Sequence, residues 1–152
     1  MHSVVIADTS CFILLTKINE IDLLRRIYSS VYTTPDVASE FRYDLPEWII
    51  IREVKDKNAL FTLQAELDPG EASAIALTFE LPDAIVVLDD WGARKVAARF
   101  NIAFTGTFGI IIKAKQNGII PLVKPIFDKI KQTNFRISEE LVTEILTEAN
   151  EL

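Results

Sequence analysis

The stretch VVIADTS, residues 4–10, decides the fold, because four apolar residues are followed at once by an aspartate and two hydroxyl side chains. A short apolar run without alternation is typical of a strand buried on both faces of a parallel sheet. The stretch AIVVLDD, residues 84–90, has the same form and also ends in aspartates. Three further runs predict extended segments: residues 31–33, 102–104, and 48–54 as an edge strand or extended linker.

Helical segments separate these strands. The clearest helix start is Asp68-Pro69-Gly70-Glu71, where Asp68 suits the N-cap and Pro69 the first helical position, and this helix should end near Phe79 or Glu80. The other predicted helices are residues 11–17, 21–28, 34–43, 55–64, 91–100, 105–117, 121–132 and 138–150. Alternating strands and helices predict an α/β fold, with a parallel sheet covered by helices on both faces.

Length and composition restrict the possible classes of protein. A chain of 152 residues, 49% of them hydrophobic, is expected to form one domain, residues 1–152, that ends in an acidic amphipathic helix within residues 138–152. One cysteine, Cys11, excludes an internal disulfide, and the single His2 argues strongly against catalysis by a histidine base. No apolar run approaches the ~20 residues of a membrane helix, so we expect a soluble, cytoplasmic protein with no membrane partner.

Charge is distributed unevenly along the chain. Residues 1–92 hold 7 basic and 16 acidic side chains, whereas residues 93–137 hold 9 basic and one acidic side chain. Solvated helix faces explain such runs in most proteins. The alternative is an acidic site beside a basic track that binds a polyanion, and charge alone does not decide between them.

Carboxylates occur where strands end and on the inner sides of helices. Asp8 and Asp89 end two strands, and in parallel α/β sheets sites form beyond the carboxyl ends of strands. Glu40 and Glu71 flank the apolar stripes of their helices. Each has a structural alternative: Asp8 as a helix cap, Glu71 as part of a capping box, Glu40 as a surface residue, and Asp89 or Asp90 as the cap of the next helix.

Convergence of these acids would favour a metal ion. Clustered carboxylates repel one another, and without histidine or cysteine the simplest compensation is a hard cation such as Mg²⁺ or Mn²⁺. Such ions activate water and stabilise displacement at phosphorus. An acidic metal cluster beside a basic track predicts a metal-dependent nuclease.

The chain also resembles the PIN domain, and within that family the VapC-like prokaryotic branch. The resemblance covers roughly residues 3–120, with some similarity again in residues 134–138. It is carried by the acids in order and by the segments around them: Val4–Ser10, Thr34–Phe41, Gly70–Leu77, Val86–Asp90 with Ala93-Arg94, and Thr105–Ile110. One departure is Glu71, which stands where the family usually has aspartate.

The resemblance implies a fold, an activity and a set of roles. The fold is a PIN-like three-layer α/β/α sandwich around a mostly parallel sheet of four to five short strands. The activity is a Mg²⁺- or Mn²⁺-dependent ribonuclease, in many relatives the toxin of a toxin–antitoxin pair, a homodimer neutralised by a small antitoxin. The catalytic acids and metal ligands would be Asp8, Glu40, Glu71 and Asp89, with Asp90 as a further ligand. Four residues would orient ligands or phosphate: Thr9, Ser10, Thr107 and Arg94.

Two other functions stay open at this point. The first is a degenerate PIN fold that binds RNA or a protein partner without cleavage. The second is a small α/β phosphatase, although Asp8-Thr9-Ser10 lacks the second aspartate that this class uses. Gly106 and Gly109 do not form a phosphate-binding loop. Trp48 and Trp91 are expected to pack in the core rather than to stack on bases.

Overall fold

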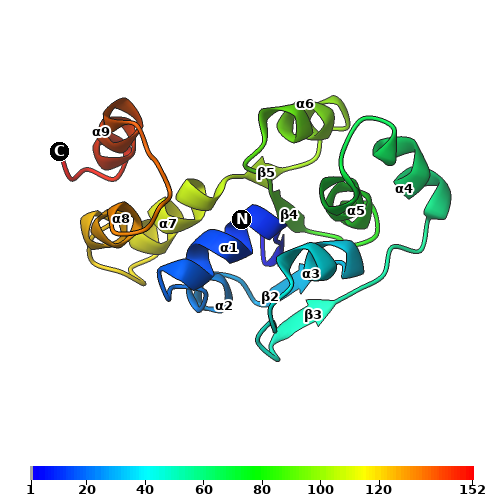
Figure 1. Ribbon diagram of the computed structural model, residues 1–152, viewed down its shortest axis with the longest axis horizontal. Coiled ribbons are helices and arrows are strands. Elements are labelled where there is room, and N and C mark those ends of the chain that lie inside the picture. The colour runs from blue at the N-terminus through cyan, green and yellow to red at the C-terminus, as the bar shows by residue number, and fades with distance from the viewer. Residues whose placement is uncertain (1) are drawn as a thin grey trace.

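A parallel β-sheet forms the centre of the molecule (Figure 1). The computed structural model describes residues 2–152. Within that range the sheet has five strands in the order β3-β2-β1-β4-β5, and every neighbouring pair is parallel. The strands are β1 Val4–Ile6, β2 Ser30–Thr33, β3 Ile49–Ile51, β4 Ala84–Val87 and β5 Phe104–Thr105.

Helices lie on both faces of this sheet. They are α1 Thr9–Lys17, α2 Leu23–Ile27, α3 Pro35–Phe41, α4 Lys57–Gln64, α5 Pro69–Thr78, α6 Trp91–Arg99, α7 Thr107–Gln116, α8 Lys124–Lys131 and α9 Glu139–Glu148. Figure 1 shows α1, α2, α7 and α8 on one side of the strands and α4, α5 and α6 on the other. This three-layer α/β/α arrangement confirms the fold class expected from the sequence.

Adjacent residues of β1 enter opposite cores. Val5 packs with α1, α7 and α8 in one cluster of buried side chains, and Ile6 packs with α5 and α6 in the other. Both side chains are 0% exposed. Burial on both faces explains why the strands are continuous apolar runs rather than alternating ones.

Some predicted boundaries are wrong by a few residues. The strand expected at residues 102–104 lies at Phe104–Thr105, because Asn101 and Ile102 still complete the end of α6 through hydrogen bonds to Ala98 O and Ala97 O. The next helix begins at Thr107 rather than Thr105, because Thr105 pairs with Val87 in the sheet. The helix expected from residue 121 begins at Lys124.

The strand order has a functional consequence. From β1 the chain adds β2 and β3 on one side, and β4 and β5 are added on the other. The order therefore reverses between β1 and β4, and such a switch point opens a crevice beyond the carboxyl ends of the two strands. Asp8 and Asp89 follow β1 and β4 and so lie at this crevice.

The sequence also suggests a symmetric homodimer through an excess of apolar residues at 11–15 and 21–27, but most of these residues are internal. Cys11, Leu14 and Leu15 are at most 3% exposed, and Leu23 and Leu24 are at most 2% exposed. Their apolar character is therefore explained by the chain's own core, and the argument for a dimer from these residues is wrong. The homodimer itself stays a prediction. Among the described residues, no helix combines the length and apolar character needed to cross a membrane.

The C-terminal helix α9 is fixed by the residues that follow it. Glu151, whose side chain is 5% exposed, accepts hydrogen bonds from the backbone N–H groups of Val123 at 2.6 Å and Lys124 at 3.0 Å. Its carboxylate also lies 3.0 Å from the ammonium group of Lys115. An acid at the start of α8 is favourable, because these N–H groups have no partner within the helix.

We predict that Glu151→Ala lowers the free energy of unfolding by roughly 1–3 kcal/mol, because it leaves two backbone N–H groups and one ammonium group without their acceptor. Urea titration measures the change. The matched control is Glu148→Ala, which removes an exposed carboxylate from α9 and should be nearly neutral. Equal stability of the two variants would contradict this role of Glu151.

Candidate functional site

Two aspartates meet at the reversal of strand order. Asp8 is 6% exposed, and its carboxylate caps α1 by accepting from the N–H of Cys11 at 3.1 Å. The Ser10 hydroxyl lies 3.1 Å from Asp8 Oδ2 and 2.9 Å from Asp89 Oδ2. Because a hydroxyl carries one proton, Ser10 can donate to only one of the two carboxylates at a time. Asp8 therefore is the helix cap that the sequence allowed, and it also faces a second carboxylate.

Asp89 is held in place by the start of α7. The backbone N–H and hydroxyl of Thr107 donate to its two carboxylate oxygens at 2.8 and 2.6 Å. Thr107 is itself 1% exposed. The neighbouring Asp90 has a different role, because it caps α6 by accepting from the N–H of Ala93 at 2.9 Å. The two adjacent aspartates thus divide the tasks that the sequence left open between them.

Glu40 is an exposed residue of α3 whose carboxylate contacts two neighbouring helices. Its carboxylate accepts from the Thr9 hydroxyl and from the N–H of Gly70, both at 2.9 Å. A Cβ atom at position 70 would lie 2.5 Å from Glu40 Oε1, so only glycine allows the carboxylate to reach the start of α5. Glu40 is therefore bound between α1 and α5 rather than simply solvated.

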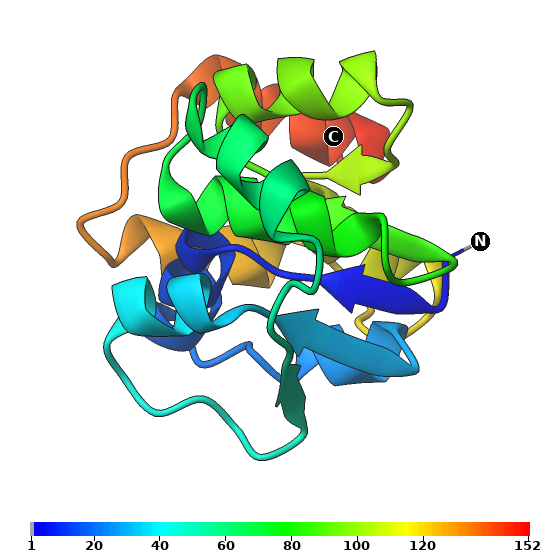
Figure 2. The same cartoon turned by 90° about the vertical axis from the view of Figure 1, so that its right-hand side faces the viewer.

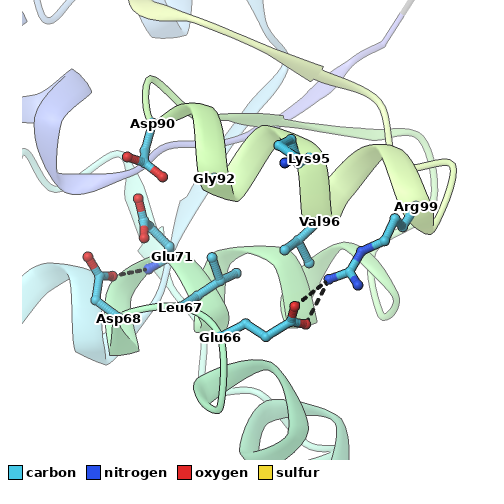
Figure 3. Close-up of a pocket in the computed structure, with 9 residues that line it drawn as sticks. All are labelled: Glu66, Leu67, Asp68, Glu71, Asp90, Gly92, Lys95, Val96 and Arg99. Carbon is cyan, nitrogen blue, oxygen red and sulfur yellow. Dashed lines mark hydrogen bonds and ion pairs between the residues drawn. The ribbon is translucent and has the colours of Figure 1, made fainter.

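Glu71 stands among other acids. Asp68 caps α5 by accepting from the N–H of Glu71 at 2.9 Å, and Figure 3 shows Asp68, Glu71 and Asp90 grouped at one end of a cavity. Within residues 2–152 the Glu71 carboxylate makes no return bond to the Asp68 N–H, so the predicted capping box is only half formed. In the sequence Asp68 has only the signature of a helix cap, which gives no sign of its place beside Glu71.

A small cavity joins most of these acids. It has a volume of about 210 Å³, and its lining residues are Asp8, Thr9, Ser10, Ile13, Glu40, Asp68 and Glu71. A second cavity, of about 430 Å³, continues from Asp68, Glu71 and Asp90 along α6 to Lys95 and Arg99. Asp89 lines neither, and it reaches the first cavity through its contact with Ser10.

Burial and mutual repulsion change the acidity of two of these groups. Burial, followed by the charge of Asp89, raises the pKa of Asp8 from 3.8 to about 7 against the opposing hydrogen bonds from Cys11 and Ser10. Burial and the charges of Asp68 and Asp90 raise the pKa of Glu71 from 4.5 to about 7. Within residues 2–152, no lysine, arginine or histidine forms an ion pair with any of the six acids. Their negative charge is therefore not balanced by a direct ion pair, although the Arg94 guanidinium and the Asp89 carboxylate both lie against Gly106.

The chemistry of these side chains can be compared with the ligands that a divalent cation prefers. All possible metal ligands here are carboxylate or hydroxyl oxygens, which Mg²⁺ and Mn²⁺ prefer. The raised pKa values of Asp8 and Glu71 show that burial and neighbouring acids disfavour their negative charge, which a bound cation would stabilise. In the part of the chain that the structure describes, however, no three acids converge closely enough to form a ligand cluster. The residues fit such an ion by their chemistry and charge. They lie as neighbouring pairs, however, and do not surround a single point as a complete set of metal ligands would.

Arg94 is a basic group that lies with Asp89 against Gly106. Its Nε donates to the carbonyl of Leu88 at 2.6 Å, and its guanidinium lies over the ring of Phe104 with its carbon 5.8 Å from the centroid. A side chain at Gly106 would collide with the guanidinium, which explains the glycine there. The structure thus fixes Arg94 on the same side of the molecule as Asp89.

The structure also places the basic run and the two tryptophans. Several members of the basic run in residues 93–137 are paired: Lys115 with Glu151, Lys124 with Asp128, and Lys129 with Glu20. These pairs occupy only part of the run, and a basic track for a polyanion stays an open alternative. Trp48 packs against the core as expected, whereas Trp91 is 72% exposed, so the prediction of core packing is wrong for Trp91.

Comparison with known proteins agrees with this geometry. The parallel α/β sheet with acids at the reversal of strand order defines the class of fold, and a family model described as a PIN domain matches residues 4–151. The chain therefore belongs to the PIN-domain family, whose members are generally nucleases. A search of the curated proteins gives no match.

We predict that the metal-free protein loses stability as the pH rises from about 4 to about 7. The folded state holds the Asp8 proton more tightly than the unfolded chain does, so the free energy of unfolding falls as that proton is lost. Asp8→Asn stays neutral and still caps α1. It should gain on the order of 1–3 kcal/mol over the wild type at pH 8, since one pKa unit corresponds to about 1.4 kcal/mol.

Urea titration between pH 4.5 and 8 in the presence of a chelator measures this difference. Asp44→Asn, which removes an exposed carboxylate outside the site, is the matched control and should keep the wild-type slope. A pH dependence of Asp8→Asn equal to that of the wild type would show that the folded state does not raise the pKa of Asp8.

Proposed function

We propose that this protein is an endoribonuclease that depends on Mg²⁺ or Mn²⁺ and hydrolyses phosphodiester bonds in RNA. One observation carries the proposal: Asp8 and Asp89 face each other through Ser10 at the reversal of strand order, and no cationic side chain pairs with either within the described residues. Glu40 and Glu71 line the cavity beside Asp8. A nuclease needs such uncompensated acids to bind its metal ion beside a phosphate.

Each residue has a role in this proposal. Asp8, Glu40, Glu71 and Asp89 would hold the cation, with Asp90 as a further ligand. Ser10 and Thr107 orient Asp89 by their hydroxyl groups, and Thr9 orients Glu40. Arg94, fixed by Leu88 and Phe104, would bind a phosphate oxygen of the RNA backbone.

The chemistry follows from these positions. A bound divalent cation would supply Lewis acidity, which lowers the pKa of an attacking water and stabilises negative charge on phosphorus oxygens. The protein keeps the acids in fixed positions through backbone N–H donors at the starts of α1, α5 and α7. Because these donors are held by secondary structure, little reorganisation is needed when the charge changes during the reaction.

Resemblance to the VapC-like branch extends the proposal to a biological role. The protein would be the toxin of a type II toxin–antitoxin pair, act on cellular RNA in the cytoplasm, form a homodimer and bind a small antitoxin protein. Supporting the extension are the PIN-domain match over residues 4–151 and the glutamate at position 71, which occurs in that branch.

A second candidate is a PIN-fold module that binds RNA or a protein without cleaving it. The observation in its favour is that no three acids converge within residues 2–152, and that Asp8, Glu40 and Asp89 all accept hydrogen bonds from the protein. Metal-dependent cleavage separates this candidate from the ribonuclease.

We predict that the purified protein cleaves single-stranded RNA with Mg²⁺ or Mn²⁺, and poorly with Ca²⁺ or in chelator. Asp89→Asn should reduce the cleavage rate by about a hundredfold or more, since even the loss of a group that orients a metal ligand costs about 10–100-fold. End-labelled RNA resolved on denaturing gels measures the rate. Asp44→Asn should cleave like the wild type, and RNA left intact under every metal condition would favour the binding module.

Manganese should also stabilise the fold. An ion that binds the native state but not the unfolded chain adds roughly 2–3 kcal/mol at about a hundredfold excess over its dissociation constant. Thermal melting with and without Mn²⁺ measures the shift, which Asp8→Asn should lose. If Asp8 were only a helix cap, Asp8→Asn and the wild type would show equal shifts, and Asp8→Ala would cost ~1 kcal/mol with or without metal.

A further inference from the structure

A third cavity opens on the other side of the Asp8–Asp89 pair. It has a volume of about 340 Å³, and its lining residues are Ser10, Leu14, Asp89, Arg94, Thr107, Phe108, Phe135 and Leu141. They come from α1, α6, α7, α9, the β4–α6 connection and the α8–α9 connection. In Figure 2 the α8–α9 connection, in orange, lies on the side of the molecule toward which the strand arrows point. The function proposed above uses its polar end and leaves its apolar end unassigned.

The polar end of the cavity belongs to the candidate site. Asp89 and Thr107 are hydrogen-bonded to each other, and Ser10 lines both this cavity and the one that contains Glu40 and Glu71. A molecule in the third cavity would therefore lie beside Asp89, with Ser10 between it and Asp8. That position suits the part of a substrate next to the reacting bond.

The apolar end contains a supported aromatic surface. Phe108 packs against Phe127, which is 1% exposed, with ring centroids 5.7 Å apart. Phe135 meets Phe108 nearly edge-on, with centroids 6.3 Å apart and an interplanar angle of 72°, and remains 45% exposed. The core therefore fixes the ring of Phe108, while the ring of Phe135 beside it remains partly exposed to solvent. Leu14 and Leu141 complete the apolar lining.

Arg94 supplies a fixed positive charge to the same cavity. Its Nε is bonded to the Leu88 carbonyl and its guanidinium is packed between Phe104 and Gly106. Within the described residues the guanidinium forms no direct ion pair, and the Asp89 carboxylate lies with it against Gly106. The guanidinium can therefore still bind an anion in the cavity. A pre-positioned guanidinium is well suited to phosphate.

We propose that this cavity binds a nucleobase of the RNA strand, with the phosphate of that nucleotide at Arg94, and thereby influences where the strand is cut. The inference rests on the proposed ribonuclease function for its reference to cleavage. A base has a flat face that can stack on Phe135, with Phe108 edge-on beside it, and an edge of donors and acceptors for Ser10, Thr107 and Asp89. One cavity therefore offers a cation for the phosphate, and an aromatic ring with polar groups beside it for the base.

The first test measures binding without catalysis. Adenosine and uridine 5′-monophosphates and ribose 5-phosphate are titrated into the ¹⁵N-labelled full chain in chelator. We expect the nucleotides to bind more tightly than ribose 5-phosphate and to shift the amide signals of Thr107, Phe108 and Phe135. Equal affinity for ribose 5-phosphate, or shifts confined to other regions, would overturn the proposal and leave the cavity as a docking site for a protein segment.

The second test uses variants of Phe135. Phe135→Ala should weaken nucleotide binding by about ten- to a hundredfold while leaving ribose 5-phosphate unaffected, because stacking on one aromatic ring is lost. Phe135→Tyr keeps the ring and should restore binding, which separates stacking from a general effect on the fold. Phe61→Ala, which removes a 78% exposed ring from α4, is the matched control. Equal binding by Phe135→Ala and Phe61→Ala would overturn the proposal.

Cleavage distinguishes failure of this inference from failure of the proposed function. With Mn²⁺ and a mixed-sequence RNA, Phe135→Ala should still cut but with a changed distribution over dinucleotide steps, and an unchanged distribution would count against the base site. If the wild type binds nucleotides but never cleaves RNA, the ribonuclease proposal fails while nucleotide binding in this cavity stands. If it cleaves RNA but binds no nucleotide, the inference fails alone.

Discussion

Repulsion between Asp8 and Asp89 is the constraint on which the site depends. The carboxyl ends of β1 and β4 place the two acids at neighbouring positions, and the single proton of Ser10 cannot satisfy both. Burial then raises the pKa of Asp8 to about 7, with Asp89 adding to the effect. Keeping such a pair without a direct ion-pair partner lowers the free energy of unfolding at neutral pH. A cation at this point would recover that stability, which is why the arrangement points to function rather than to packing.

The rest of the site holds these acids in place. Helix starts supply N–H donors to Asp8, Glu40 and Asp89, and the missing side chain of Gly70 lets Glu40 approach α5. Gly106 similarly leaves room for the guanidinium of Arg94. The same groups that complete local hydrogen bonding therefore also position the charged atoms. In the sequence, the role of Asp8 as a helix cap looks like an alternative to a role as a metal ligand. In the structure the two roles are compatible, because Asp8 caps α1 and also faces Asp89.

Sequence patterns predicted the parallel sheet and the acids at the strand ends, because apolar runs and their terminal aspartates are local features. They did not place Asp68 beside Glu71, since its signal as a helix cap explained the residue completely. Phe135 was also missed, because its relation to Phe108 depends on how the α8–α9 connection folds back over the sheet. The count of basic residues in the run at 93–137 could not show which of them are paired either. Lys115 and Lys129 form ion pairs with Glu151 and Glu20, which are distant in sequence.

The most direct test of the central claim is an anomalous difference map from crystals of the full chain soaked in Mn²⁺. The account predicts a single strong peak in the crevice between the ends of β1 and β4. It should lie within coordination distance of Asp8 and of at least one of Asp89 and Glu71, and Asp8→Asn crystals should lack it. A map with no peak there at millimolar Mn²⁺, or with manganese bound only at other surface acids, would contradict the claim that these carboxylates form a metal site.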